Sequence, residues 1–257
     1  MKFFANSSYP LSKIVLASAS APFYFDPVKL EISEGQTGVF LDGGVSPFND
    51  ASSELFLMAA LSAEQGAADA NDEGTTPFGF NWPTGHDKIF LLSIGAGSYR
   101  VKYEAEAFRK LSAAAQGVET LKSLMFDAQK NAHAWMQAIS IPPRTGQAID
   151  VQHLIDSNLG AMRGLRLLQQ PLLTFRRADA TIDGEWLSKN LDLTYTETNI
   201  KDLRELDCRH RTMHERCLEI GRAVGAKFVD KTDFPSSFDL EEWQTRNAQV
   251  SLFEFAQ

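Results

Sequence analysis

The strongest chemical signal in the sequence is the segment FLDGGV, residues 40–45, in which an acid and two glycines follow apolar residues. The pattern predicts a strand over 38–44 whose apolar part stops at Asp42. A carboxylate at the carboxyl end of a strand lies where α/β enzymes build their sites, and Gly43 and Gly44 allow close backbone approach beside it. Asp42 is therefore a candidate active-site acid, but taken by itself an aspartate before two glycines is more typical of a tight turn.

A second group of residues has the chemistry of a zinc site. Two cysteines and two histidines occur in CRHRTMHERC: Cys208, His210, His214 and Cys217. Three of them follow helical spacing, and both residue types bind zinc. Paired CxxC motifs are absent, however, and an apolar stripe at helical spacing runs through the same segment: Met213, Cys217, Ile220 and Val224. The stripe favours Cys217 as a core residue, and a zinc-stabilised interaction module is kept as an alternative.

The composition excludes several classes of protein. The chain has 257 residues, 44% of them hydrophobic, which suffices for one good core or two small ones. Its formal net charge of -8 argues against nucleic acid as a partner, because phosphate binding needs a basic surface. The 2 cysteines are too few for a disulfide scaffold and favour a reducing cytoplasm. No apolar run approaches the roughly 18 residues that a membrane-spanning helix needs.

The elements that would position these residues alternate between strands and helices. Strands are predicted over 28–32, 38–44, 88–94 and 172–182, and helices over 11–19, 51–65, 119–139 and 211–229. Residues 66–86 are a loop rich in Gly, Asn, Asp, Thr and Pro. The alternation predicts an α/β protein with a parallel sheet.

Motifs along the chain, taken in order, resemble the second half of the patatin-like phospholipase domain. That family has an ASSAAPxxFxPV segment, a strand ending in Asp-Gly-Gly, an Asn-Pro, a helix, and a strand ending in Ser-x-Gly-Thr-Gly. The matching residues here are Ala17–Val28, Asp42–Val45, Asn49 and Ser93–Gly97. The segments 124–129, 175–187 and 218–226 are similar to the C-terminal part of bacterial members, so the resemblance covers nearly the whole chain.

The resemblance implies a partial patatin-like three-layer α/β fold: a mostly parallel sheet flanked by helices, with a helical C-terminal region. Residues 1–100 would be the C-terminal portion of the catalytic domain, 101–230 the helical region packed on it, and 231–257 an irregular tail. It also implies a lipid acyl hydrolase with a Ser–Asp dyad and no cofactor or metal. Asp42 would be the catalytic base, and Gly43, Gly44 and Asn49 would belong to the active-site loop. The substrate would be a lipid or other fatty-acyl ester.

The chain departs from this family pattern in two respects. It contains no Gly-x-Ser-x-Gly, the pentapeptide that carries the nucleophile, and no Gly-rich oxyanion loop. We therefore expect a C-terminal portion of the domain that is inactive by itself, or else a non-catalytic lipid-binding or regulatory remnant of the fold. Ser18, Ser20 and Ser98 lack the glycine spacing of the elbow and are poor substitutes. In addition, Asp50 stands where the family has proline.

Two further expectations concern membranes. The segment KIVLASASAPFYF, residues 13–25, contains Ala-x-Ala sites like those of a secretory signal, but Ser12, Lys13 and Ser18 interrupt its apolar run. We expect it instead to lead toward Asp42, as the resemblance implies, in a cytoplasmic protein. Peripheral membrane contact is left open, through a patch of loop aromatic residues: Phe78, Phe80 and Trp82.

Overall fold

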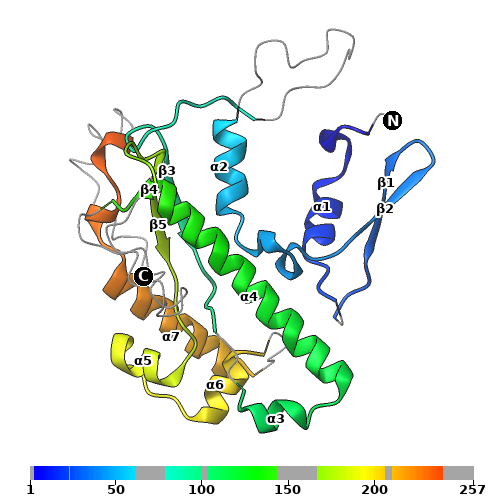
Figure 1. The fold of residues 1–257 in the computed structure, drawn as a ribbon, viewed down its shortest axis with the longest axis vertical. Helices are drawn as coiled ribbons and strands as arrows, with labels where there is room; N and C mark the ends of the chain where they lie inside the picture. Colours follow the sequence, from blue (N-terminus) through cyan, green and yellow to red (C-terminus); the bar gives the residue numbers. More distant parts are fainter. Residues whose placement is uncertain are drawn as a thin grey trace. The chain divides into compact units, whose positions relative to one another are not determined.

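The computed structural model describes residues 3–22, 24–61, 79–99, 103–143, 167–205 and 210–239. Within these ranges the protein is a mixed α/β structure with seven α-helices, a three-strand parallel sheet and a two-strand antiparallel hairpin (Figure 1). The chain forms two compact units that alternate along the sequence. Unit 1 comprises Met1–Phe80 and Arg100–Trp135, and unit 2 comprises Asn81–Tyr99 and Met136–Gln257. The α/β class is confirmed, while the boundaries implied by the family resemblance, after residues 100 and 230, stay predictions.

Unit 1 is built from helices and the hairpin. Helix α1 (Leu11–Ser18) starts directly after Pro10, whose missing N–H is harmless there. Strands β1 (Val28–Ser33) and β2 (Gln36–Phe40) then form the hairpin, with Gly35 in the left-handed region at φ 69°. The helices of the unit are α2 (Ser52–Ala60), α3 (Ala105–Arg109) and most of α4 (Ala113–Ile139).

The hairpin corrects one expectation. We predicted that the strand before Asp42 would belong to the same parallel sheet as residues 88–94. Instead β2 pairs antiparallel with β1, and among the residues described it has no other strand partner. The physical reason is the tight turn at Glu34–Gly35, because a turn of this length can join only antiparallel neighbours. Asp42 therefore follows a hairpin strand.

Unit 2 contains the parallel sheet, in the order β3 (Phe90–Ile94), β5 (Leu173–Ala178), β4 (Ser140–Ile141). Strand β5 is central, and its Leu173 and Phe175 are fully buried. The remaining helices are α5 (Gly184–Leu191), α6 (Glu197–Leu203) and α7 (Arg211–Phe228), and α7 packs against β5 (Figure 1). They enclose one apolar core: Ala180, Ile182, Leu187, Leu191, Ile200, Ile220 and Val224.

Residues 231–239, the first part of the predicted irregular tail, are held against this sheet. Asp233 is buried and lies 3.3 Å from Nε of Arg176 on β5. The ring of Phe90 on β3 contacts those of Phe234 and Phe238, at centroid distances of 6.1 and 5.7 Å. Two short 3-10 helices, Lys231–Asp233 and Ser236–Phe238, form this segment. The rest of the predicted tail lies outside the described residues.

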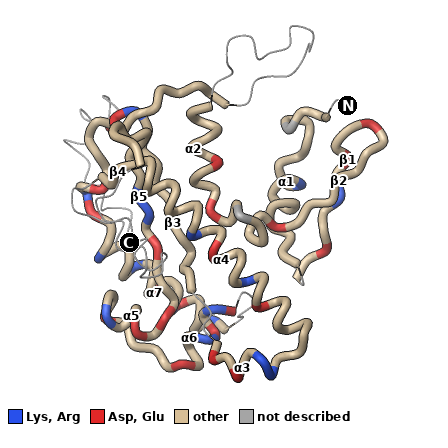
Figure 2. Tube along the Cα trace, in the orientation of Figure 1, with Lys and Arg blue, Asp and Glu red and all other residues tan. Residues whose placement is uncertain are grey.

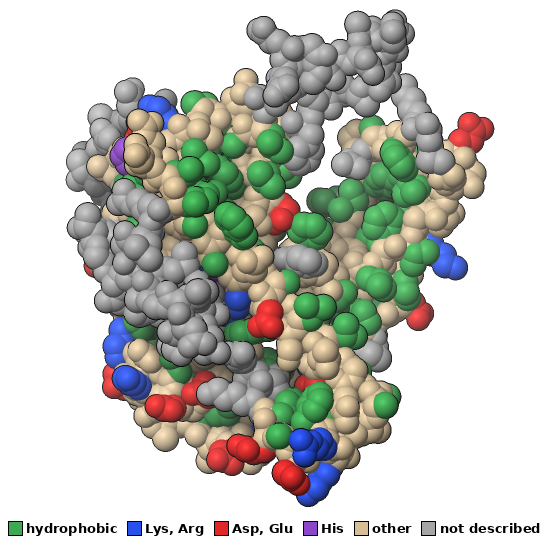
Figure 3. All heavy atoms as spheres, in the orientation of Figure 1, with side chains coloured by type: hydrophobic (Ala, Val, Ile, Leu, Met, Phe, Trp, Pro, Cys, Tyr) green, Lys and Arg blue, Asp and Glu red, His purple; other side chains and the backbone are tan. Residues whose placement is uncertain are grey.

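The surface of unit 1 is rich in apolar side chains. Helix α1 carries one charged residue, Lys13, and α2 one, Glu54 (Figure 2). Hydrophobic side chains gather over both helices and over the hairpin in the space-filling view (Figure 3). The exposed ones include Leu11, Val15, Val39, Leu55 and Leu57. None of the described helices is both long and apolar enough to cross a membrane.

Candidate functional site

Asp42 lies two residues beyond the end of β2, at the start of a 3-10 helix, Gly43–Val45. Its Oδ1 accepts a hydrogen bond from the backbone N–H of Gly44 at 2.5 Å, and its own N–H donates to the carbonyl of Ser20 at 3.0 Å. The side chain is half-buried. Within the described ranges, Oδ2 accepts no hydrogen bond and forms no ion pair, so one oxygen of this carboxylate is engaged and the other is open.

The residues predicted to surround Asp42 do come together in unit 1. A Cβ on Gly44 would lie 2.9 Å from Oδ1 of Asp42 and 3.4 Å from Oδ1 of Asn49. Glycine is needed at 44 because of this crowding, not because of an unusual dihedral, since neither Gly43 nor Gly44 has a positive φ. Gly43 is less constrained, because the nearest atom to a Cβ there would be Ser18 Oγ at 4.0 Å.

Three side chains cap successive turns between β2 and α2. The carboxylate of Asp42 accepts the N–H of Gly44. The hydroxyl of Ser46 accepts the N–H of Phe48 at 3.2 Å, and the carboxylate of Asp50 accepts the N–H of Ser52 at 2.9 Å. Each acceptor thus binds the amide two residues ahead, which is the local bonding that Asp and Ser favour at turns. We call residues 42–50, with these three caps, the capped loop.

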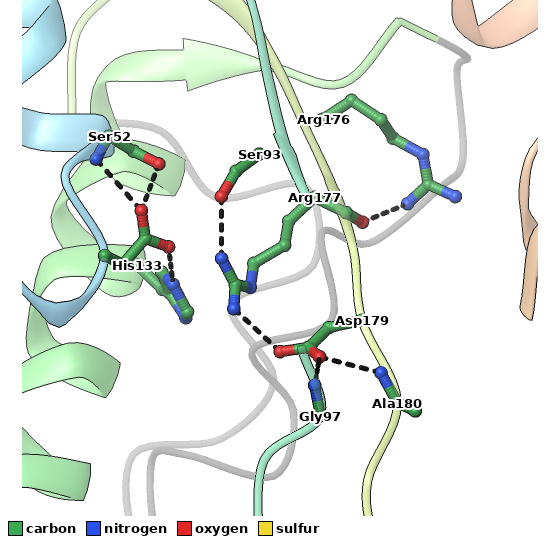
Figure 4. A network of polar contacts seen from close by, with 9 residues as sticks. Ser52, Ser93, Gly97, His133, Arg176, Arg177, Asp179 and Ala180 are labelled. Atoms are coloured by element: carbon green, nitrogen blue, oxygen red, sulfur yellow. Dashed lines mark hydrogen bonds and ion pairs between the residues drawn. The ribbon is translucent and has the colours of Figure 1, made fainter. Parts of the chain in front are cut away.

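Asp50 makes the strongest polar contacts of the capped loop. Its Oδ1 also accepts the hydroxyl of Ser52, and its Oδ2 accepts a hydrogen bond from Nε2 of His133 on α4. Figure 4 shows Ser52 and His133 directed at this one carboxylate. The exposed fractions of the Asp50 and His133 side chains are 5% and 4%.

Sequence reasoning missed this contact. A polar histidine within the predicted helix 119–139 is expected at the surface or half-buried, whereas the structure buries His133. A signal was present in the sequence: His133 lies one turn before the apolar Met136, which proves to be the most buried described residue of α4. A second signal was Asp50, an acid at the position where the family pattern has proline, because an acid can pair with a histidine.

Among the described residues, no hydrogen bond joins the Asp42 carboxylate to any of the serines that we considered as substitute nucleophiles. Ser20 is fully buried, and its hydroxyl donates to the carbonyl of Leu16 at 2.6 Å. Ser18 is exposed, at the end of α1. Ser98 lies in unit 2, in a bridge with Thr181. In the part of the chain that the structure describes, no serine hydroxyl contacts the Asp42 carboxylate.

Unit 2 has a polar cluster of its own at the carboxyl ends of β3 and β5 (Figure 4). Arg177 donates to Ser93 Oγ at 2.6 Å and to Asp179 Oδ2 at 2.7 Å. The other oxygen of Asp179 accepts the N–H groups of Gly97 and Ala180, at 3.0 and 2.8 Å. The cluster shapes the turn after β3, where its charges and amides satisfy one another.

The zinc hypothesis finds little support among the described residues. His210, His214 and Cys217 are exposed, and Cys208 lies outside the described ranges. No group of three or more ligand side chains comes together in the part of the chain that is described. The placement of Cys217 in the core is wrong: Met213, Ile220 and Val224 are buried, while Cys217 lies at the edge of their stripe and faces solvent.

The predicted aromatic patch is described only in part. Phe80 and Trp82 are exposed, and Phe78 lies outside the described ranges.

A scan against protein-family models finds no match to the chain, and searches of curated proteins and of solved structures find none either. The patatin-like interpretation therefore depends on the motifs and on the geometry around Asp42 alone.

Proposed function

We propose that this chain carries the acid part of a patatin-like lipid acyl hydrolase, with Asp42 as the base of a Ser–Asp dyad. The observation that carries the proposal is the state of the Asp42 carboxylate. One oxygen is fixed by the amide of Gly44 and the other is open, on a half-buried side chain. A base needs this combination of a defined position and a free lone pair.

The proposed reaction is the hydrolysis of a fatty-acyl ester. Asp42 takes the proton of a serine hydroxyl as that oxygen attacks the ester carbonyl; the ester C–O bond then breaks and the proton passes to the leaving alcohol. Water, deprotonated by Asp42, next attacks the acyl-serine, and the fatty acid leaves as the serine oxygen regains its proton. Such proton transfer contributes about 10²–10⁴ in rate. The serine would lie in a Gly-x-Ser-x-Gly elbow, and backbone N–H groups would stabilise the oxyanion. Since these 257 residues contain no such pentapeptide, the nucleophile would come from other polypeptide.

The apolar surroundings of Asp42 support a lipid as the substrate. Exposed hydrophobic side chains lie on both sides of it in the sequence and within the same unit: Tyr24, Phe25, Leu41, Val45 and Phe48. An acyl chain gains free energy by covering such side chains, at about 25 cal/mol per Å² of apolar surface. Contact with a membrane would then be peripheral.

A second candidate function is a non-catalytic one, in which the same fold binds lipid or regulates another protein. The observation that favours it is the absence of the nucleophile motif from the chain. The capping bond between Asp42 and Gly44 agrees with it as well, because a purely structural aspartate would make the same contact.

The experiment begins with the coding DNA. The reading frame preceding residue 1 is determined, and a protein that includes an in-frame Gly-x-Ser-x-Gly is expressed beside the 257-residue chain. We expect the longer protein to hydrolyse a nitrophenyl acyl ester and to react with a fluorophosphonate probe. The 257-residue chain should do neither, and its turnover of the ester would contradict the missing nucleophile.

The role of the acid is then tested by substitution. In the longer protein, Asp42→Asn should lower turnover by about 10²–10⁴ while circular dichroism stays unchanged. Asp26→Asn is the matched control, because Asp26 is an exposed acid of the same unit. Near-normal turnover in Asp42→Asn would show that Asp42 is not the base. A stop codon in place of the motif, together with binding of a fluorescent fatty acid by the 257-residue chain, would favour the second candidate.

A further inference from the structure

The capped loop is fixed to the rest of unit 1 at its two ends. At the first end, the backbone N–H of Asp42 donates to the carbonyl of Ser20, beyond α1. At the other end, Asp50 binds His133 of α4. Between these ends the caps bond locally, since Asp42, Ser46 and Asp50 each accept an amide two residues ahead.

The Asp50 end is the more constrained because it is buried. A carboxylate removed from water is stable only where hydrogen-bond donors replace the water, and it takes the position that those donors define. Asp50 receives the N–H and the hydroxyl of Ser52 on one oxygen and Nε2 of His133 on the other. Donors from α2 and α4 thus fix where the capped loop ends.

The spacing of the caps connects this end of the loop to Asp42. The caps stand four residues apart, at 42, 46 and 50, and two short 3-10 helices, Gly43–Val45 and Pro47–Asn49, fill the intervals. Asn49, next to Asp50, has its side chain close to Gly44, whose amide holds Asp42. A displacement at Asp50 would therefore reach Gly44 through a short series of contacts.

We propose that Asp50 and His133 are positioning residues for Asp42: their buried contact holds the capped loop so that Gly44 keeps its hydrogen bond to the Asp42 carboxylate. The inference deepens the proposed function and rests on it only for the role of Asp42 as a base. His133 does not touch the reacting atoms and acts through Asp50 and the loop.

The test is amide hydrogen exchange measured by NMR on the 257-residue chain. His133→Leu removes the donor to Asp50, and we expect the Gly44 amide to exchange about tenfold faster or more, relative to amides of the β1–β2 hairpin. His133→Gln keeps an N–H that can reach Asp50 and should leave the Gly44 rate close to that of the wild type. His86→Leu is the control, because His86 is an exposed histidine in unit 2.

Two results would overturn the inference. One is a folded His133→Leu protein whose Gly44 amide exchanges as in the wild type. The other is an equal acceleration at Gly44 and in the hairpin, which would mean that the contact adds only general stability. If His133→Leu does not fold, Asp50→Asn takes its place, with a faster Gly44 amide supporting the inference and an unchanged one refuting it. Because exchange needs no substrate, these outcomes are separate from the test of Asp42 as a base.

Discussion

Individual residues in both units are held by side-chain oxygens that bind nearby backbone amides. In unit 1 the carboxylate of Asp42 accepts the amide of Gly44, and in unit 2 that of Asp179 accepts the amides of Gly97 and Ala180. Such bonds satisfy amides that the turns leave without a partner, and a buried amide left unpaired would cost about 1–3 kcal/mol. The same carboxyl groups also leave no room for a side chain at Gly44 and Gly95, because a Cβ there would lie 2.9 Å from Asp42 and 2.2 Å from Asp179.

Gly95 is the sharpest case of such a constraint. A Cβ there would lie 2.2 Å from the carboxyl group of Asp179, which Arg177 and two amides hold in place. We expect Gly95→Ala to lower the free energy of unfolding by about 1–3 kcal/mol or more, measured by urea denaturation. In the control Gly221→Ala nothing lies within 4 Å of the new Cβ, and helix α7 should gain about 0.5–1 kcal/mol. Equal stability of the two variants would contradict this account.

For individual residues, the sequence predicted contacts between near neighbours in the chain and missed a contact between residues far apart in it. Asp42 stands out because the two glycines beside it form a recognisable motif, and the structure brings Gly44 and Asn49 to it. The contact between Asp50 and His133 joins residues 83 positions apart, and no periodicity relates them. Histidine is intermediate in its preference for burial, so the composition of α4 gave little indication that His133 is buried.

At the scale of elements, the segment 229–239 shows how a stretch with little regular structure becomes fixed. Arg176 on β5 donates to the carbonyls of Arg177 and Phe228, at 2.9 and 2.5 Å, and its guanidinium faces Asp233. The carboxylate of Asp233 also accepts the N–H of Asp230 at 2.8 Å. One buried ion pair thus joins the central strand to the segment after α7.

We expect Asp233→Ala to destabilise the protein by about 3–5 kcal/mol, because it leaves the Arg176 guanidinium buried without its carboxylate. Asp239→Ala, at an exposed acid of the same segment, should stay within about 0.5 kcal/mol of the wild type. Both values come from urea unfolding followed by circular dichroism. A loss below about 1 kcal/mol for Asp233→Ala would mean that the pair is exposed in solution.

Helices and strands follow from the sequence more reliably than their pairing does. The predicted helices over 11–19 and 211–229 and the strands over 88–94 and 172–182 correspond to α1, α7, β3 and β5. Each of these has an apolar period or run of its own. The sheet to which β2 belongs depends on contacts outside the strand, and the same apolar alternation suits a hairpin and a parallel sheet equally.

On the scale of the whole molecule, much apolar surface lies open. Leu121, Leu124 and Trp135 are exposed on α4, and β2 has no buried residue. Among the described residues, β2 also pairs only with β1, which leaves its second edge unpaired. Unpaired edges with apolar side chains promote association between chains.

We therefore expect the 257-residue chain to self-associate as its concentration rises, measured by sedimentation velocity. Val39→Glu should reduce the association, because a charge on an edge strand opposes pairing and Lys29 lies opposite on β1. Leu218→Glu, at an exposed apolar residue of α7, is the control and should change little. A chain that sediments as a monomer at every concentration would contradict the expectation.

The two paired strands of the parallel sheet, β3 and β5, are synthesised at different times on the ribosome. Phe90 of β3 pairs with Thr174 of β5, about eighty residues later. At synthesis rates of about 5–20 residues per second, β3 waits several seconds for the strand that covers it. During that interval the apolar sequence of β3 is accessible to chaperones. Slow codons placed between the two strands would therefore lengthen the time for which β3 lacks its partner strand.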